Sequence, residues 1–497
     1  MPDIILIYPR IGDMDVIRDK PHLPLPLIQA ASLVAQHYDI SILDLRISQP
    51  WQQVIDRELA TKPIFVGLSV MSGQPIASAL EVSRYIKTKS DVHIVWGGNH
   101  PTLSPEETLS DPAVDSVVIG DGEETLLEFA DKLSLQKSLR GIKGLWFKEG
   151  NEIVKNEFRA PVDMDSLPLP PYHLVHTDDY VQEYRGRNMI NIETSRGCKY
   201  KCRYCYHTAR TGFHGFRSLN VEKSLERIFW ACDVCNVEGV YLVDDNFFLN
   251  KDRGMEIARA LSYDKREIYW QIQGVDVPSM LGFSHRELKE LESSRLVRIS
   301  VGAESGSPDT LRHVRKPHTV DTLVQANRLW SGYDINVFYS WIAGIPGETI
   351  EDVKKTVEMM FRLMKDNPRA RLSPLYNFLP FPGTALWYEV VEKHGFEPPK
   401  SLSDWGEYDW SRVNVPYLSP EMKHALDNLY FASLCIDNKF DDYALPKWLY
   451  WATRAYRPFA RMRMKNLFYH FPIEKYVAGL VERIMSKSKQ PPKPWTL

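Results

Sequence analysis

The sequence predicts an α/β protein in which a doubly wound parallel sheet is followed by a partial (β/α)6 barrel and a mostly helical C-terminal region. Three observations support this fold class. Short β-rich runs alternate with helix-length stretches in two separate series, a proline-rich segment separates the series, and the alternation stops near residue 386. A chain of 497 residues also exceeds one ordinary core, so several domains are expected.

The first series predicts a Rossmann-like domain over residues 1–150. Its five β-rich runs lie at 4–8, 40–45, 64–70, 92–98 and 116–120. Such runs, joined by crossover helices, form parallel sheets whose ligands bind at the carboxyl ends of the strands. Ser69, Gly97 and Gly98 lie at those ends, and glycine lets a ligand approach the backbone closely. This edge is therefore expected to bind a ligand.

The second series predicts a barrel over residues 188–385. A proline-rich linker, 151–187, precedes it. Six β-rich runs follow, at 189–193, 239–245, 268–274, 296–304, 335–344 and 371–380. Because chemistry in βα barrels collects at the carboxyl ends of the strands, the segments after these runs form the candidate site.

The composition is that of an ordinary globular protein. Hydrophobic residues make up 44% and charged residues 25% of the chain, and no apolar run approaches the roughly 20 residues that span a bilayer. The opening "MPDIILIYPR" lacks the marks of a signal peptide, so the expected compartment is the cytoplasm. Six cysteines cannot form a disulfide scaffold in so long a chain, and their clustering points to metal or redox chemistry.

Three of these cysteines lie close together. Cys198, Cys202 and Cys205 form CxxxCxxC directly after the first barrel strand. Thiolates at this spacing suit zinc or an iron–sulfur cluster. A structural zinc needs a fourth ligand, for which His207 is available, whereas three thiolates on a four-iron cluster leave one iron open to a ligand that is not protein. The iron–sulfur interpretation is favoured.

At these residues the sequence resembles the radical S-adenosylmethionine superfamily, whose signature is CxxxCxxC with an aromatic residue, here Tyr204, before the last cysteine. The resemblance implies a [4Fe-4S] cluster whose open iron is chelated by S-adenosylmethionine. One electron from the cluster then generates a 5′-deoxyadenosyl radical. The resemblance also implies contacts to S-adenosylmethionine from residues that match by position, namely Asp244, Asp245, Glu304, Gly344, Pro346 and Gly347.

Other features near these positions allow two interpretations each. Arg315 and Lys316 could neutralise the carboxylate of S-adenosylmethionine, but a solvated charge pair is slightly favoured. Cys232 and Cys235 form a CxxC on one face of a predicted helix, where two ligands do not complete a second cluster. The segment 378–387 resembles the one that closes the barrel in related enzymes and is expected to shape the substrate side.

The order of the domains, a sheet followed by this barrel, resembles the cobalamin-binding-domain subgroup of the superfamily. That subgroup includes radical methyltransferases, hopanoid methylases and the anaerobic magnesium-protoporphyrin ester cyclase. The resemblance implies that cobalamin enters the sheet edge near Ser69, Gly97 and Gly98. The cobalamin-ligating pattern DxHxxG is absent, and its nearest approximation is Asp19 with His22. The alternative is a domain that binds nothing or only shapes the substrate cavity.

The C-terminal region, 386–497, is aromatic and basic. From Lys447 onward there are eleven Lys and Arg and two Glu. The net charge of this tail is therefore +9, whereas that of the whole chain is −3. Basic and aromatic residues interleave at helical spacing: Arg454, Arg457, Arg461 and Lys465 with Trp448, Trp451, Phe459 and Phe468. The favoured interpretation is a cap over the barrel mouth that holds an anionic substrate. Peripheral contact with an anionic membrane ranks second and a solvated face third, while nucleic-acid binding is disfavoured.

These observations predict a cobalamin-dependent radical methyltransferase that acts on an unactivated carbon. In the enzymes that the sequence resembles, the radical removes a substrate hydrogen, the carbon radical takes a methyl group from methylcobalamin, and a second S-adenosylmethionine restores the donor. A flavodoxin- or ferredoxin-type reductant is implied. The alternatives are a radical cyclase, oxidoreductase or carbon–carbon coupling enzyme, and a cluster-binding sensor without turnover. The substrate is left open among small molecules, lipids and peptides.

Overall fold

A doubly wound sheet forms the N-terminal part of the molecule. The structure is a computed structural model that describes residues 2–12, 20–47, 50–209, 215–443, 447–470 and 476. The sheet has the strand order β2-β1-β3-β4-β5-β6-β7, and its first five strands are parallel. They are β1 (Ile4–Tyr8), β2 (Ile40–Asp44), β3 (Phe65–Ser69), β4 (His93–Gly97) and β5 (Ser116–Val118). All five predicted strands are confirmed. The order in which strands are added to the sheet reverses between β1 and β3, and ligands of such folds bind at this point.

Helices cover both faces of this sheet. They are α2 (Leu25–Val34), α3 (Trp51–Leu59), α4 (Gln74–Lys89), α5 (Asn99–Leu103), α6 (Pro105–Ser110) and α7 (Glu123–Ser134). Alternate residues of β1 point to opposite faces, so Ile4 and Leu6 pack in the core with α2 and α7. Ile5 and Ile7 pack in the other core, with α3 and α4. This division is the mark of a doubly wound fold.

Two further strands extend the sheet beyond the predicted ones. β6 (Leu145–Glu149) and β7 (Glu152–Lys155) form an antiparallel hairpin on β5. The sheet therefore continues past residue 150, and the expected linker 151–187 contributes β7 to the first sheet and β8 (Gln182–Tyr184) to the second. The domain boundaries remain a prediction.

The second sheet is a partial barrel of six parallel strands with β8 added antiparallel at one edge, in the order β16-β15-β14-β13-β12-β9-β8. The parallel strands are β9 (Arg187–Ile192), β12 (Gly239–Leu242), β13 (Tyr269–Val275), β14 (Leu296–Glu304), β15 (Asn336–Ala343) and β16 (Ala370–Asn377). Its helices are α8 (Val221–Cys235), α9 (Lys251–Tyr263), α10 (Val277–Leu281), α11 (His285–Ser293), α12 (Pro308–His313), α13 (Val320–Trp330) and α14 (Ile350–Asp366). The predicted (β/α)6 architecture is confirmed.

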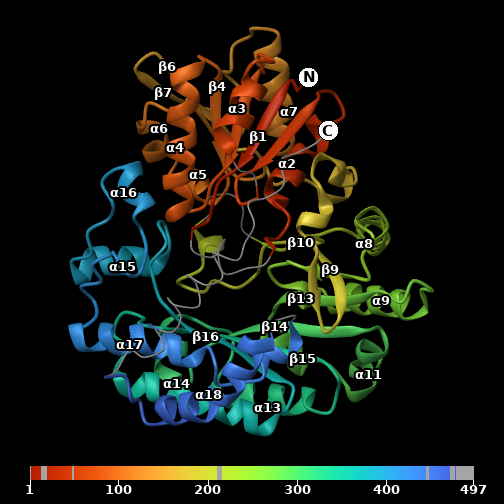
Figure 1. The fold of residues 1–497 in the computed structure, drawn as a ribbon, viewed down its shortest axis with the longest axis vertical. Coiled ribbons are helices and arrows are strands. Elements are labelled where there is room, and N and C mark those ends of the chain that lie inside the picture. Colours follow the sequence, from red (N-terminus) through yellow and green to blue (C-terminus); the bar gives the residue numbers. More distant parts are fainter. Residues whose placement is uncertain are drawn as a thin grey trace.

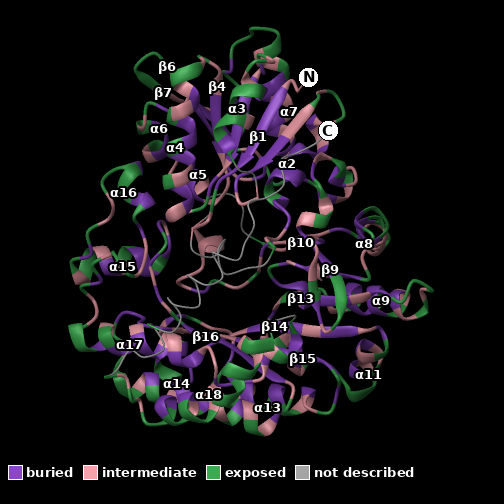
Figure 2. Ribbon diagram, viewed as in Figure 1, coloured by how far each residue is buried: buried purple, intermediate pink, exposed green. Residues whose placement is uncertain are grey.

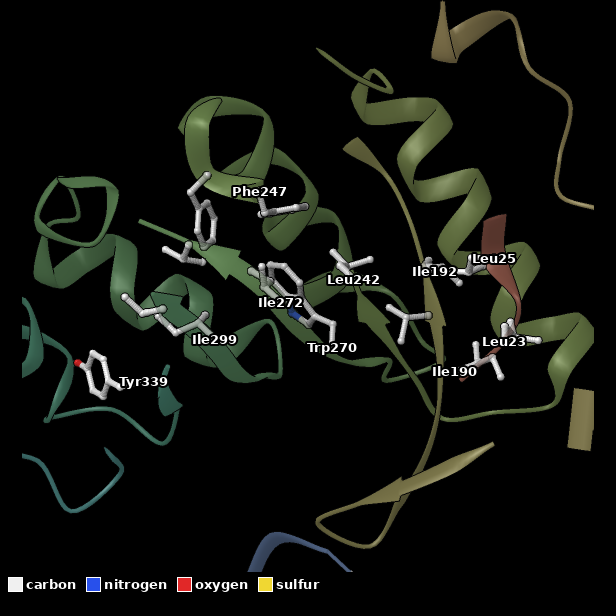
Figure 3. Close-up of a cluster of buried hydrophobic side chains, with 14 of the residues drawn as sticks. Leu23, Leu25, Ile190, Ile192, Leu242, Phe247, Trp270, Ile272, Ile299 and Tyr339 are labelled. Carbon is white, nitrogen blue, oxygen red and sulfur yellow. The ribbon is translucent and has the colours of Figure 1, made fainter. Parts of the chain in front are cut away.

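The convex face of the barrel sheet is buried under these helices. Ile192, Trp270 and Tyr339 belong to one apolar core that continues into the N-terminal part. Leu23, which precedes α2, and Leu25, the first residue of α2, join this core beside β9 (Figure 3). The two sheets thus share a continuous core, and their carboxyl edges face each other across the centre of the molecule (Figure 1).

The C-terminal region connects the two sheets and covers an edge. Its helices are α15 (Ala385–His394), α16 (Leu402–Gly406), α17 (Pro420–Ser433) and α18 (Lys447–Lys465). α16 packs on α4 of the N-terminal part, and α17 packs on β16 (Figure 1). Ser433 and Asp437 accept hydrogen bonds from the backbone N–H groups of Leu375 (2.9 Å) and Leu372 (2.7 Å). These contacts satisfy the outer edge of β16, which would otherwise invite strand pairing.

The position of α18 corrects one prediction. The helix packs on α17 and α14 on the outside of the barrel and does not cap the barrel mouth. Arg457 donates to Asn438, and Arg461 donates to the carbonyl of Ile436 (2.7 Å). These two arginines therefore hold a neighbouring loop, and the interpretation as a substrate-binding cap is wrong for this helix.

Candidate functional site

A two-stranded ribbon presents the cysteine loop. β10 (Ser195–Arg196) pairs with β11 (Arg217–Ser218), and the loop begins at Gly197. Gly197 has φ +83°, and a Cβ there would lie 2.1 Å from the carbonyl oxygen of Gly215. Only glycine fits this conformation and this approach. The N–H of Gly197 donates to Asp245 (2.7 Å), which joins the loop to the end of β12.

The three cysteines fit a cluster with one open iron. Cys202 is buried, and Cys198 and Cys205 are partly buried. Burial raises the pKa of the Cys205 thiol to about 12, so a thiolate there needs the charge of a metal. Among the described residues, no three His, Cys, Asp or Glu side chains surround a single point as the ligands of one ion do. A four-iron cluster makes no such demand, because each thiolate binds its own iron.

His207, the candidate fourth ligand of a zinc site, is engaged elsewhere. Its Nε2 lies 2.7 Å from Oδ1 of Asp245. The two aspartates after β12 differ in their surroundings. Asp244 is fully buried, and its carboxylate accepts hydrogen bonds from Thr194 (2.7 and 2.6 Å) and Ser195 (2.6 Å). Burial raises the pKa of Asp244. Its carboxylate therefore holds the β10 segment, while Asp245 faces a cavity.

Glu304, at the end of β14, is the centre of a buried polar group. Its Oε1 accepts hydrogen bonds from Tyr204 (2.8 Å) and Lys316 (3.0 Å). The interpretation of Lys316 as a solvated charge is wrong, because its side chain is only 12% exposed. Arg315 is exposed, as that interpretation expects. Tyr204 precedes Cys205, so this group joins the cysteine loop to β14.

The turn after β15 has the shape that its glycines predict. Gly344 and Gly347 have φ +83° and +81°, a region that favours glycine. Pro346 is buried between them. The carboxylate of Glu348 accepts a hydrogen bond from the N–H of Gly344 (2.6 Å) and closes the turn. Burial raises the pKa of Glu348 to about 7. A Cβ on Gly344 would lie 2.9 Å from Leu426 of α17, so this helix packs directly on the turn.

A cavity of about 330 Å³ lies between the two facing edges. Ser69, Gly97 and Gly98 of the first sheet line it together with Asp245 and His207 of the barrel. Its volume is within the range of ligand pockets. A Cβ at Gly97 would meet only Val118, at 3.7 Å, so any side chain there would occupy space that a ligand can use. The glycine edge leaves space at Gly97, and the cavity brings the predicted cobalamin residues to the barrel.

An ion-pair network joins the two parts beside this cavity. Arg196 and Arg217 are cross-strand partners in the β10–β11 ribbon. Arg217 donates to both carboxylate oxygens of Asp121, which follows β5, and one of these bonds measures 3.0 Å. Arg196 donates to Glu123 (2.7 Å) and Glu193 (2.9 Å). Burial alone would raise the pKa of Asp121, but Arg217 and Arg196 lower it to about 2. Sequence reasoning missed this network, whose members are far apart in the chain.

The concave face of the barrel carries a cation that sequence reasoning also missed. Arg298 of β14 is partly exposed on this face, like its neighbours Tyr241 and Phe338. Its guanidinium lies 4.4 Å from the centre of the Phe338 ring and donates to Tyr443 (2.7 Å). Its Nε has no hydrogen-bond partner among the described residues. The alternation of buried and exposed positions along β14 could have indicated this residue.

Of the two residues that come nearest to the absent DxHxxG pattern, the structure describes only His22. The His22 ring lies 5.7 Å from the Tyr241 ring, over the barrel, and Asp19 lies outside the described residues. The expectation that Cys232 and Cys235 are structural agrees with their burial in α8. The segment 378–387 contacts the cysteine loop, since a Cβ on Gly383 would lie 3.0 Å from Ala209.

Comparison with protein families matches both parts of the chain. Residues 22–130 match the B12 binding domain, and residues 192–360 match the radical SAM superfamily. The resemblance to the radical S-adenosylmethionine superfamily that the cysteine motif indicates is confirmed for the barrel. The predicted cofactors, a [4Fe-4S] cluster, S-adenosylmethionine and cobalamin, are those of these two families.

Two curated relatives are similar to most of this chain. An uncharacterized methyltransferase of Pyrococcus horikoshii is 29% identical over 74% of this chain and 78% of its own length. The anaerobic magnesium-protoporphyrin IX monomethyl ester cyclase of a Synechocystis species is 24% identical over 93% of this chain and 92% of its own length. The relatives thus include both a methyltransferase and a cyclase.

Two solved structures share the fold. The cobalamin-dependent S-adenosylmethionine radical enzyme OxsB, with aqua-cobalamin and S-adenosylmethionine bound, superposes with a TM-score of 0.73 and 19% identity over 98% of this chain and 75% of OxsB. The radical S-adenosylmethionine methyltransferase TsrM of Kitasatospora setae, with cobalamin and a [4Fe-4S] cluster bound, gives a TM-score of 0.68 and 18% identity over 98% and 100% of the two chains. The whole arrangement of sheets is therefore shared.

Proposed function

We propose that the protein is a cobalamin-dependent radical S-adenosylmethionine methyltransferase that acts on an unactivated carbon. One observation carries this proposal. A single cavity is lined by the glycine edge of the B12 binding domain and by Asp245, which accepts the hydrogen bond of Gly197 immediately before the cysteines. A methyl donor in the first domain and a radical source in the second must share one space, and this cavity is such a space.

The proposed site residues have distinct roles. Cys198, Cys202 and Cys205 hold the cluster, and Ser69, Gly97 and Gly98 form the edge that receives cobalamin. When bound, the cluster and S-adenosylmethionine supply a radical that removes a hydrogen atom, and cobalamin supplies the methyl group.

The strand ends that follow are proposed to receive S-adenosylmethionine. They carry the backbone of Asp244 and Asp245, the Glu304 group, and the turn of Gly344, Pro346 and Gly347. The continuous core and the network at Asp121 fix these two edges relative to each other. The protein thereby orients the cofactors and excludes water and oxygen from the space between them.

A cation on the concave face of the barrel, near the amino end of β14 and outside the residues that line the cavity, gives a separate argument about the substrate. Arg298 is a partly exposed cation beside Phe338 and Tyr241. Such a site recognises a planar or aromatic group that carries a carboxylate or phosphate. We therefore favour an anionic small-molecule substrate. The proposal also includes a flavodoxin- or ferredoxin-type reductant and a location in the cytoplasm. None of the described helices is long and apolar enough to cross a membrane.

An anaerobic labelling experiment tests the proposal. The protein is reconstituted with iron, sulfide and hydroxocobalamin, desalted, and incubated with methyl-labelled S-adenosylmethionine and reduced flavodoxin. The expected result is a retained corrinoid spectrum, formation of 5′-deoxyadenosine, and methyl label in the corrinoid fraction. The matched variant, with Cys198, Cys202 and Cys205 replaced by Ala, keeps the corrinoid and forms no 5′-deoxyadenosine.

The cyclase relative favours a second candidate function. A radical cyclase or other radical enzyme without methyl transfer yields 5′-deoxyadenosine but no label in the corrinoid, and this outcome would replace the proposed function. A cluster-binding sensor yields neither signal.

A further inference from the structure

The outward face of α18 is apolar. Trp448, Trp451, Ala455, Phe459 and Met462 follow one another at helical spacing and lie on one side of the helix. The four large side chains are 49%, 65%, 39% and 42% exposed. Isolated apolar residues on a surface need no explanation, but a contiguous stripe over several turns of one helix does.

The inward face of the same helix is only partly apolar. A helix on the surface of a soluble protein buries its apolar residues and exposes its charged ones. The residues of α18 that are buried against the protein are Thr453, Ala460, Arg463 and Met464. Arg463 is completely buried while Trp451 is exposed. The outward face of α18 is therefore suited to a partner that is less polar than water.

A row of cations borders the apolar stripe. Lys447, Arg454 and Lys465 are exposed, and their spacings of 7 and 11 residues place them on one line along the helix. Tryptophan beside lysine and arginine is the composition of helices that lie in the interface of a bilayer, where the rings enter the headgroup region and the cations meet anionic lipids. Cations along one border attract a negatively charged surface, so the expected partner is anionic.

We propose that α18 docks the protein on the surface of an anionic lipid bilayer. The helix lies parallel to the bilayer, with Trp448 and Trp451 inserted and with Lys447, Arg454 and Lys465 at the phosphate level. α18 packs on the outer helices α14 and α17, and Figure 2 shows exposed segments along it. Docking there leaves the cavity between the two sheets open. The proposal does not depend on the reaction that the protein catalyses.

Sedimentation with lipid vesicles tests the proposal on the full-length chain. The vesicles contain phosphatidylcholine alone or with phosphatidylglycerol in a ratio of about 7:3. We expect the protein to sediment with the anionic vesicles and much less with the neutral ones. Raising NaCl from about 0.05 M to about 0.5 M should weaken the binding, since salt screens the attraction.

Variants identify the face that binds. The double variant Trp448→Ser/Trp451→Ser should reduce binding about tenfold, and Lys447→Glu/Arg454→Glu/Lys465→Glu should abolish the preference for anionic vesicles. The matched control, Leu135→Ser/Tyr263→Ser, removes two exposed apolar side chains far from α18 and should bind like the parent. Thermal midpoints of all variants check that the fold is intact.

Three outcomes overturn the proposal. The first is that the full chain ignores anionic vesicles while a chain ending at residue 470 binds them, which means that the tail covers the stripe. The second is a homodimer in analytical ultracentrifugation that Trp448→Ser/Trp451→Ser dissociates, with no vesicle binding. The third is binding that the tryptophan variant leaves unchanged.

Discussion

Gly197 sets the path of the chain into the cysteine loop. Its φ is +83°, and a Cβ on it would lie only 2.1 Å from the carbonyl oxygen of Gly215, which leaves no space for a side chain. We expect Gly197→Ala to lower the free energy of unfolding by at least about 1 kcal/mol and to reduce the iron bound after anaerobic reconstitution. Iron and sulfide analysis measures the second effect. Gly332→Ala is the matched control, because nothing lies within 4 Å of a Cβ there; equal iron contents in the two variants would contradict the prediction.

Glu304 and Lys316 form a nearly buried pair, with side chains 10% and 12% exposed. Removing one partner leaves the other charge in a poorly hydrated place. Lys316→Met is therefore expected to lower the free energy of unfolding by about 3 kcal/mol. The double variant Glu304→Gln/Lys316→Met should recover at least about 1 kcal/mol, because no uncompensated charge remains. Urea unfolding of the parent and the two variants measures both values, and a double variant less stable than Lys316→Met would refute this account.

The sequence predicted these residues unequally. The cysteines were identified from their spacing, and Glu304 from its place after a strand. The engagement of Lys316 with Glu304 could not be read from the sequence, because it depends on the turn after α12 folding back over β14. The same holds for Asp244, which the resemblance places beside S-adenosylmethionine through its carboxylate or its carbonyl. The structure shows that its carboxylate is bonded to Thr194 and Ser195.

At the scale of elements, the strands that local sequence patterns indicate were predicted. The pairings between distant segments were not. The eleven parallel strands are apolar or rich in β-branched residues, so each was found within a few residues of its bounds. β6, β7 and β8 were missed. β7 is short and polar, and the tip of its hairpin reads "KEGNE". β8 was hidden in a segment whose prolines indicated a linker.

The β10–β11 ribbon is the element that ties the cysteine loop to the B12 binding domain. Arg196 and Arg217 converge on Asp121 from this ribbon. Under the proposed function, we expect Asp121→Asn to loosen the relative position of the two cofactors and to slow labelling of the corrinoid about tenfold. Retention of cobalamin and formation of 5′-deoxyadenosine should change much less.

The readout separates positioning from folding. A variant that merely destabilises the protein lowers all three signals together, and that result would contradict a positioning role. Glu238→Gln is the control, because it breaks the exposed ion pair between Glu238 and Arg187 at the edge of the barrel sheet. Exposed pairs of this kind contribute little, so its labelling rate should match that of the parent.

At the scale of the whole molecule, the relation between the two sheets was beyond the reach of sequence patterns. The continuous core that includes Leu23 and Leu25, the bridge from α16 to α4, and the cavity between the two edges all join residues separated by more than a hundred positions. Each pattern along the chain describes one element, whereas the site exists only where elements of two domains meet.

Three histidines, which lie on β4, in α5 and just before α13, predict how the stability of the molecule depends on pH. Burial lowers the pKa of His93 to about 4, and those of His100 and His318 to about 3. The unfolded chain, with an ordinary value near 6.5, therefore binds these protons more tightly than the folded one. Stability is complete above about pH 6.5 and falls as the pH drops below it, by roughly 2 kcal/mol for each histidine at about pH 5.

Glu348 acts in the opposite direction. Its raised pKa of about 7 means that the folded state binds this proton more tightly, so lowering the pH from about 7 to about 5 returns roughly 2 kcal/mol. For these three histidines and Glu348 together, the free energy of unfolding is expected to fall by about 4 kcal/mol between about pH 7 and about pH 5. Urea midpoints of the protein without its cluster at the two pH values measure it. His100→Gln should flatten the dependence, whereas His37→Gln, at an exposed position, should not. Stability that does not change over this range would mean that these histidines take up protons without unfolding, contrary to their burial.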